Sequence, residues 1–154
     1  MLINIVVVGS PKNRQAQALT EDYIGRVRRY TRIELTAIKQ EPVLPGRERD
    51  ALRREAIRLA AYREGSYNVV LDRDGEAMGS ESFAKFLKKR IMDGTKVVTM
   101  MIGGPQGFDA SIKKNADRVL SLSGMTFPHE LVVVIVAEQI YRAFAIMHGL
   151  PYHR

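Results

Sequence analysis

Glu138 and Arg142 form the charged pair best placed for chemistry, because they lie four residues apart in a long apolar segment. On a helix this spacing puts both side chains on one face, in the order that favours an ion pair. Such a pair stabilises a helix by only about 0.3 to 0.5 kcal/mol, and burying it among apolar residues carries a desolvation penalty. The sequence leaves two interpretations open, a helix-stabilising ion pair and a pair retained for function.

The C-terminal residues Tyr152, His153 and Arg154 combine an aromatic ring, a titratable ring and a guanidinium group. These groups can stack on an RNA base and hold a phosphate, although most chain ends are disordered. His129 stands where a long helix is expected to begin, and the helix dipole there favours a neutral imidazole. That ring suits either of two roles, ordering the preceding loop or direct catalysis.

Two loops connect an expected strand to an expected helix, and the first of them could hold a nucleotide. Residues 103–107, Gly-Gly-Pro-Gln-Gly, follow an expected strand and precede a helix expected to open at Asp109. Backbone groups in this position can approach a ligand at the carboxyl edge of a sheet. The glycine spacing matches neither the dinucleotide fingerprint nor the P-loop, so the motif alone also suits an ordinary tight turn. Residues 122–127 form the second connection of this kind.

The elements that position these residues alternate between short β-branched runs and helical periodicity, which predicts an α/β fold with a mainly parallel sheet and helices on both faces. We expect a single domain over residues 1–154. Strands are predicted at residues 2–8, 33–38, 67–71, 97–102 and 119–122. Helices are predicted at residues 14–30, 47–63, 81–92 and 128–148, with Ser80 as the N-cap of the third.

The run of residues 131–137 is ambiguous, since its β-branched residues favour a strand while its length also suits a buried helix. Pro128 before it, an unbroken continuation to Met147 and the stop at Gly149 favour a helix. A helix that is apolar nearly all round needs burial on several sides. We therefore expect this helix to serve as a subunit interface of a homodimer as well as a core element.

Composition narrows the possible functions. The 154 residues carry 24 Lys and Arg against 17 Asp and Glu, a net charge of +7 that favours a nucleic-acid partner over an acidic one. A merely soluble basic protein would share this charge. The absence of cysteine excludes disulfides, thiolate metal sites and cysteine nucleophiles. Residues 1–8 are apolar but far too short to span a bilayer, so we expect a buried strand of a cytoplasmic protein with no membrane partner.

The C-terminal motifs together carry a resemblance to a known family. They are Ile102 to Gly107, Met125 to His129, Glu138 to Ala143 and Pro151 to Arg154. With these motifs the chain resembles the RlmH family, ribosomal large-subunit methyltransferases of the SPOUT superfamily. That family uses S-adenosylmethionine to methylate N3 of a pseudouridine in 23S rRNA. The resemblance covers most of the chain and is densest from Val97 onward.

The resemblance implies a C-terminal trefoil knot, a homodimer, and 23S rRNA in the large subunit or assembled ribosome as substrate, with no metal. It implies a cofactor pocket formed by Leu71, Gly103, Gly104, Leu122, Ser123, Gly124, Met125, Thr126 and Phe127. It places Glu138, Arg142, His129, Tyr152 and His153 at the catalytic site, and Arg142, Tyr152, His153 and Arg154 on the RNA. At Val133 the family pattern would have arginine, which puts a contact to RNA or a partner subunit in doubt.

Two other functions fit the same sequence. A non-catalytic ribosome-binding or assembly protein would explain the basic charge without a catalytic constellation. A flavodoxin-like oxidoreductase would explain the alternation of strands and helices. Methyl transfer from labelled S-adenosylmethionine to rRNA discriminates against the first, and a colourless purified protein discriminates against the second.

Overall fold

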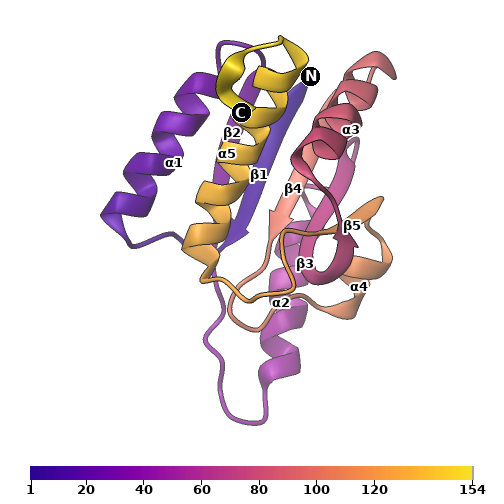
Figure 1. Cartoon of the computed structure of the whole chain (residues 1–154). Coiled ribbons are helices and arrows are strands. Elements are labelled where there is room, and N and C mark those ends of the chain that lie inside the picture. The colour runs from indigo at the N-terminus through magenta and orange to yellow at the C-terminus, as the bar shows by residue number, and fades with distance from the viewer. Residues whose placement is uncertain (154) are drawn as a thin grey trace.

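A sheet of five parallel strands forms the centre of the protein (Figure 1). The computed structural model describes residues 1–153. The strand order is β2-β1-β4-β3-β5. In chain order the strands are β1 Leu2–Val8, β2 Arg32–Ile38, β3 Tyr67–Ala77, β4 Val97–Ile102 and β5 Arg118–Ser121.

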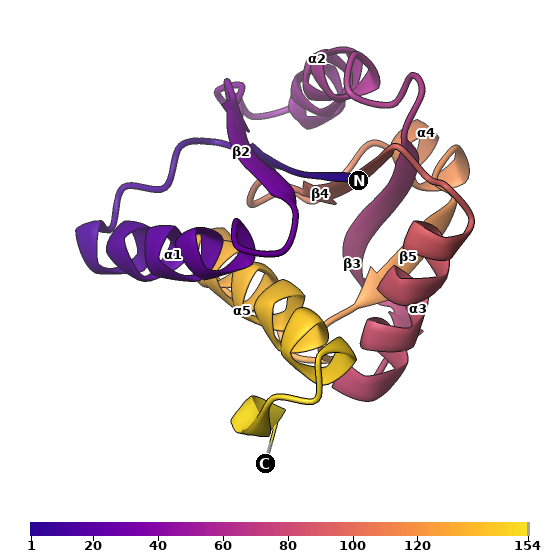
Figure 2. The ribbon, with the colours of Figure 1, turned by 90° about the horizontal axis from the view of Figure 1, so that it is seen from above.

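Helices cover both faces of the sheet, as predicted (Figure 2). The helices are α1 Arg14–Val27, α2 Glu48–Ala60, α3 Ser80–Met92, α4 Ala110–Lys114 and α5 His129–Met147, followed by the 3-10 turn Pro151–His153. Helices α1, α3 and α5 pack on one face against a core that includes Ile3, Ile5 and Met100. Helices α2 and α4 pack on the other face, which includes Val6 and Met101. A central strand such as β1 is therefore apolar on both sides, which explains its aliphatic residues, interrupted only by Asn4.

Strand β3 extends past its predicted end at Leu71 because its pairing with β5 is interrupted and then resumes. The register shifts between Leu71 and Glu76, and the strand continues to Ala77. Only glycine fits at position 75, since a Cβ there would lie 2.6 Å from the carbonyl carbon of Leu120. The shift leaves residues 72–74, which are charged, at the carboxyl edge of the sheet.

The ambiguous run of residues 131–137 is helical, as context indicated, and lies within α5. Helix α5 follows Pro128 and is ended by Gly149 with φ +67°, the left-handed conformation that favours glycine. The assignment of Ser80 as an N-cap was wrong. Gly79 is the cap and Ser80 the first helical residue, and the Ser80 hydroxyl donates instead to Gln139 Oε1 at 2.7 Å.

The valines of α5 do not form the exposed surface that the sequence suggested. Val133 is fully buried and Val134 and Val136 nearly so, because α5 packs between α1 and α3 over the sheet. Position 133 thus faces the core of this chain rather than RNA. At the start of α5, Leu131 remains exposed, with 48% of its surface accessible.

Within residues 1–153 we find no helix with the length and apolarity needed to cross a bilayer. The trefoil knot stays a prediction.

Candidate functional site

A cleft of about 860 Å³ opens at the carboxyl edge of the sheet, where the irregular part of β3 and the loops after β4 and β5 meet the start of α5. Eight of the nine predicted cofactor residues line it, the exception being Gly124, and His129 lines it as well. Apolar side chains of Ile102, Phe108 and Val132 add to the wall. The sequence motifs that were separated along the chain therefore meet around one cavity.

The glycine loop of residues 103–107 forms a tight wall of this cleft. The Gly107 amide donates to the Gly104 carbonyl at 2.9 Å, and Gly107 has φ +75°. A Cβ at Gly103 would lie 3.0 Å from the Gly107 oxygen and from the Phe108 ring, and one at Gly104 would lie 3.1 Å from Val8. The backbone can approach a ligand closely here because side chains are excluded.

Four charged residues that line the cleft, Asp72, Arg73, Asp74 and Lys113, were not among the predicted site residues. The Asp72 carboxylate and the Lys113 ammonium lie 3.1 Å apart, and both residues line the cleft. The Asp72 side chain is only 12% exposed, and Asp72 Oδ1 also accepts the Asp74 amide at 3.0 Å. A charged residue directly after a buried strand at the carboxyl edge is a signal that could have identified Asp72.

His129 begins α5 at the cleft, and its Nε2 atom is buried without a hydrogen-bond partner among the described residues. The neighbouring Glu130 carboxylate accepts the backbone amides of Lys12 and Asn13, the latter at 3.1 Å. These two bonds hold the pKa of Glu130 below its ordinary value. The start of α5 is thereby tied to the start of α1, and the orphaned Nε2 is a group that a ligand could satisfy.

Glu138 is the centre of a second polar cluster, further along α5. Its Oε1 atom accepts Arg142 Nε at 2.9 Å and lies 2.7 Å from Arg142 Nη2, while Oε2 accepts the side-chain Nε2 of Gln139 at 2.7 Å. The Tyr152 hydroxyl donates to Glu138 Oε1 at 3.2 Å and lies 3.2 Å from the Tyr23 hydroxyl. Burial, and then the Tyr23 contact, raise the pKa of Tyr152, so its hydroxyl stays protonated. The predicted ion pair exists, and it organises a network rather than only its own helix.

The C-terminal turn is packed, whereas the sequence suggested a tail outside the core. The Tyr152 ring meets Tyr141 edge to face with centroids 4.7 Å apart, and the Arg142 guanidinium lies 5.0 Å from its centre. The side chain of His153 and all of Arg154 fall outside the described residues.

The cleft and the Glu138 cluster are separate places within one chain. None of the cluster residues Glu138, Arg142 and Tyr152 lines the cleft. Glu138 lies nine positions after His129 on the helix, a rise of about 14 Å, because α5 runs away from the carboxyl edge. The structure thus brings His129 to the cofactor residues and Tyr152 to Arg142, but it does not bring the two groups together.

Comparison with known proteins identifies the family. The family described as "Predicted SPOUT methyltransferase" matches residues 1–153. The chain belongs to this family. Two proteins named ribosomal RNA large subunit methyltransferase H are similar over their whole length. The one from Caldicellulosiruptor saccharolyticus is 38% identical over 155 residues, covering 99% of this chain and 100% of the relative. The one from Syntrophobacter fumaroxidans is 39% identical over 157 residues, covering 100% of both.

Solved structures agree on the fold. A tRNA (m1G37) methyltransferase from Aquifex aeolicus superposes with a TM-score of 0.57 at 14% identity, covering 92% of this chain and 70% of that one. A probable methyltransferase from Bordetella pertussis Tohama I gives 0.58 at 12% identity, covering 92% and 95%. The predicted resemblance, the SPOUT fold class and the methyltransferase class are confirmed. The assignment of the chain to the SPOUT methyltransferase family does not support the flavodoxin-like alternative.

Proposed function

We propose that the protein methylates N3 of a pseudouridine in 23S rRNA, within the large subunit or assembled ribosome, with S-adenosylmethionine as donor. The observation that carries the proposal is a single cleft built from both loop motifs, in a chain that is 38% and 39% identical to the two named rRNA methyltransferases over 99% and 100% of its length. We further propose one domain over residues 1–154, acting in the cytoplasm where its substrate is found.

The cleft fits the proposed cofactor. Its volume lies within the range of roughly 300 to 1,000 Å³ that is usual for small-molecule sites and its wall combines apolar side chains with a few polar groups. Leu71, Leu122 and Met125 would enclose the adenine, while the glycine loop offers backbone amides and carbonyls to its edge. Asp72 and Lys113 supply opposite charges for the amino acid end, and His129 Nε2 gains a partner. When bound, this cofactor supplies a methyl group activated by its sulfonium charge.

The Glu138 cluster is suited to hold the target nucleotide. In the reaction the N3–H bond breaks, a bond forms from N3 to the methyl carbon, and the carbon–sulfur bond breaks. In this proposal Arg142 and Tyr152 position the target base, and His153 and Arg154 make further contacts to the nucleotide. Glu138 accepts bonds from three side chains, so we assign it the orientation of Arg142 and Tyr152. His129, at the cleft, is our candidate to receive the N3 proton.

These roles require two copies of the chain. The Glu138 cluster lies about 14 Å along α5 from His129. The Glu138 cluster of one protomer would therefore have to lie against the cleft of the partner protomer. A two-fold dimer provides this arrangement, since each surface is then used twice. Support comes from Leu131, an exposed apolar side chain at the start of α5, next to Glu130 and Val132.

The proposal is tested by incubating the protein with labelled S-adenosylmethionine and, separately, with protein-free 23S rRNA, large subunits and whole ribosomes. Mass spectrometry of rRNA fragments then locates the methyl group. We expect one methylated pseudouridine, on an assembled particle. Cofactor binding without transfer to any of the three substrates would contradict the proposal, and particle binding without cofactor binding would favour a non-catalytic assembly protein.

A further inference from the structure

Three arginines at the start of α2 are exposed and unpaired. Arg47, Arg49 and Arg53 have no carboxylate within 4 Å among the described residues. Together with Glu48 and Asp50 they line a surface hollow of about 470 Å³. Arg49 and Arg53 are one helical turn apart and therefore neighbours on the helix surface. We call residues 39–60, which comprise the loop after β2 and α2, the α2 arm.

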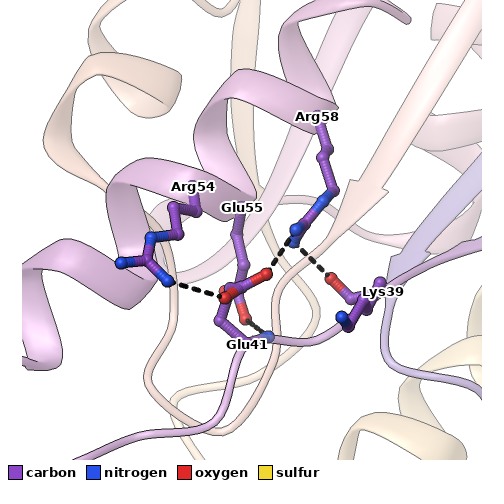
Figure 3. A network of polar contacts seen from close by, with 5 residues as sticks. All are labelled: Lys39, Glu41, Arg54, Glu55 and Arg58. Atoms are coloured by element: carbon purple, nitrogen blue, oxygen red, sulfur yellow. Dashed lines mark hydrogen bonds and ion pairs between the residues drawn. The ribbon is translucent and has the colours of Figure 1, made fainter.

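The base of the α2 arm is fixed by a buried ionic clamp (Figure 3). Glu41 is 6% exposed and its carboxylate binds the guanidinium groups of Arg58 and, at 3.4 Å, Arg54. Arg58 also donates to the Lys39 carbonyl at 3.0 Å, and the Glu41 amide donates to Glu55 Oε1 at 2.8 Å. Burying such charges contributes little net stability, because desolvation offsets the attraction. What the clamp does provide is a defined orientation of α2 relative to the loop.

The clamp also connects the arm to the cofactor cleft. Gln40 lies between its two clamped neighbours, and its side chain lies against the glycine loop, 4.0 Å from where a Cβ of Gly104 would stand. Hydrogen bonds from Ser111, and further the charge of Arg53, lower the pKa of Asp109, the residue that follows the glycine loop and Phe108. The arm extends beyond the same edge of the sheet as the cleft (Figure 1). The arm and the cleft therefore lie at the same end of the molecule.

We infer that the α2 arm is a docking surface for the phosphodiester backbone of RNA, held in register with the cleft by the Glu41 clamp. This inference rests on the proposed function. Exposed guanidinium groups bind phosphate oxygens in a bidentate manner and release counterions from the RNA. Glu48 and Asp50 disfavour a single small anion in the hollow, so the phosphates are contacted by the three arginines separately along the helix.

The test compares two triple variants with equal loss of charge. One is Arg47→Gln/Arg49→Gln/Arg53→Gln, and the control is Lys85→Gln/Lys88→Gln/Lys89→Gln on α3, whose lysines are exposed on the opposite side of the sheet. Binding to purified large subunits and to protein-free 23S rRNA is measured at several salt concentrations. Cofactor affinity is measured by calorimetry, and thermal melts establish that each variant folds.

We expect the arginine variant to bind RNA about 10- to 100-fold more weakly near 0.1 M salt, and its plot of log Kd against log salt to flatten by about 2 to 3 units. Cofactor affinity should stay within about twofold, and replacing the three arginines with lysine should restore most of the salt dependence. The inference is overturned if the wild-type protein binds neither RNA, or if the lysine control loses as much affinity as the arginine variant. If the arm proves necessary for binding but no methyl is transferred, the inference stands and the proposed function fails.

Discussion

The hydroxyl of Tyr152 lies 3.2 Å from Glu138 Oε1 and 3.2 Å from the hydroxyl of Tyr23. The contact joins the C-terminal turn to α5 and α1, which are far apart in the sequence. It also places the Tyr152 ring against Arg142, so that an aromatic face and a guanidinium are presented as one unit. A nucleotide held by this unit would meet groups whose rotamers are already fixed, which lowers the entropy cost of positioning it.

Deletion of residues 152–154 should reduce methyl transfer at least 100-fold, because the stacking ring and its partners are lost. The packing of Tyr152 on Tyr141 adds a second expectation, a decrease of about 1 kcal/mol in the free energy of unfolding. Single-turnover assays and denaturant titration measure the two effects. Tyr152→Phe is the matched variant, since it keeps the ring and removes only the hydroxyl, and should lose about tenfold or less in rate. Near-normal turnover of the truncated protein would exclude a role for the tail.

Gly103→Ala should weaken S-adenosylmethionine binding by about tenfold or more, because the new Cβ would lie 3.0 Å from the Gly107 oxygen and from Phe108 and displace the loop. Gly124→Ala is the control, since a Cβ at Gly124 meets nothing within 4 Å and this glycine does not line the cleft. Calorimetry with each folded variant distinguishes them. Equal affinities for the two variants would place the cofactor elsewhere.

Much of the fold was predictable from local sequence, because β-branched runs and helical periodicity alternate without long interruptions. The helix assignment of residues 131–137 came from its flanking residues rather than from propensity. The end of β3 was not predictable in this way. It depends on the contact between Gly75 and the backbone of Leu120, which only the folded chain brings together. The place of Asp72 directly after the predicted strand could have identified it, but its ion pair with Lys113 depends on the folded chain.

The residues of the cleft and of the Glu138 cluster were predictable from the sequence, but their arrangement in space was only partly so. Once α5 is helical, the offset of nine positions from His129 to Glu138 already implies a separation of about 14 Å along the helix. What the sequence could not show is that Tyr152 folds back onto α5, since chain ends are seldom ordered. The burial of Val133 and Val134 was also hidden, because it depends on how α1 and α3 flank the helix.

Leu131→Lys should convert the proposed homodimer into monomers, because this exposed side chain lies at the start of α5 beside the cleft. Val134 is less suitable as a probe, since it is buried and a charge there would unfold the protein. Ile57→Lys on α2 is the control, as Ile57 is 73% exposed and remote from α5. Sedimentation at micromolar concentration reports the oligomeric state. A wild-type monomer under these conditions would contradict the dimer.

The last prediction concerns the pH dependence of stability at the Glu41 clamp. Burial, together with the nearby charge of Glu41, raises the pKa of Glu55, while the Glu41 amide bond and Arg58 oppose this rise. The folded protein therefore keeps the Glu55 proton to higher pH than the unfolded chain does. Glu55 therefore contributes to the free energy of unfolding at low pH. This contribution is lost as the pH rises from the pKa of Glu55 in the unfolded chain, about 4.3, through its raised pKa in the folded protein. Glu41 acts in the opposite sense, because Arg58 lowers its pKa and its contribution is lost as pH falls below the ordinary value.

Glu55→Gln removes the first effect and keeps a carbonyl oxygen that can accept the Glu41 amide. The stability of this variant relative to wild type should therefore increase with pH, by about 1.4 kcal/mol for each pH unit between the unfolded and folded pKa of Glu55. Urea titrations at pH 4 and pH 7 measure the change, with Glu48→Gln on the exposed surface of the same helix as the control for lost charge. A difference between Glu55→Gln and wild type that is the same at both pH values would show that Glu55 ionises alike in the folded and unfolded chain.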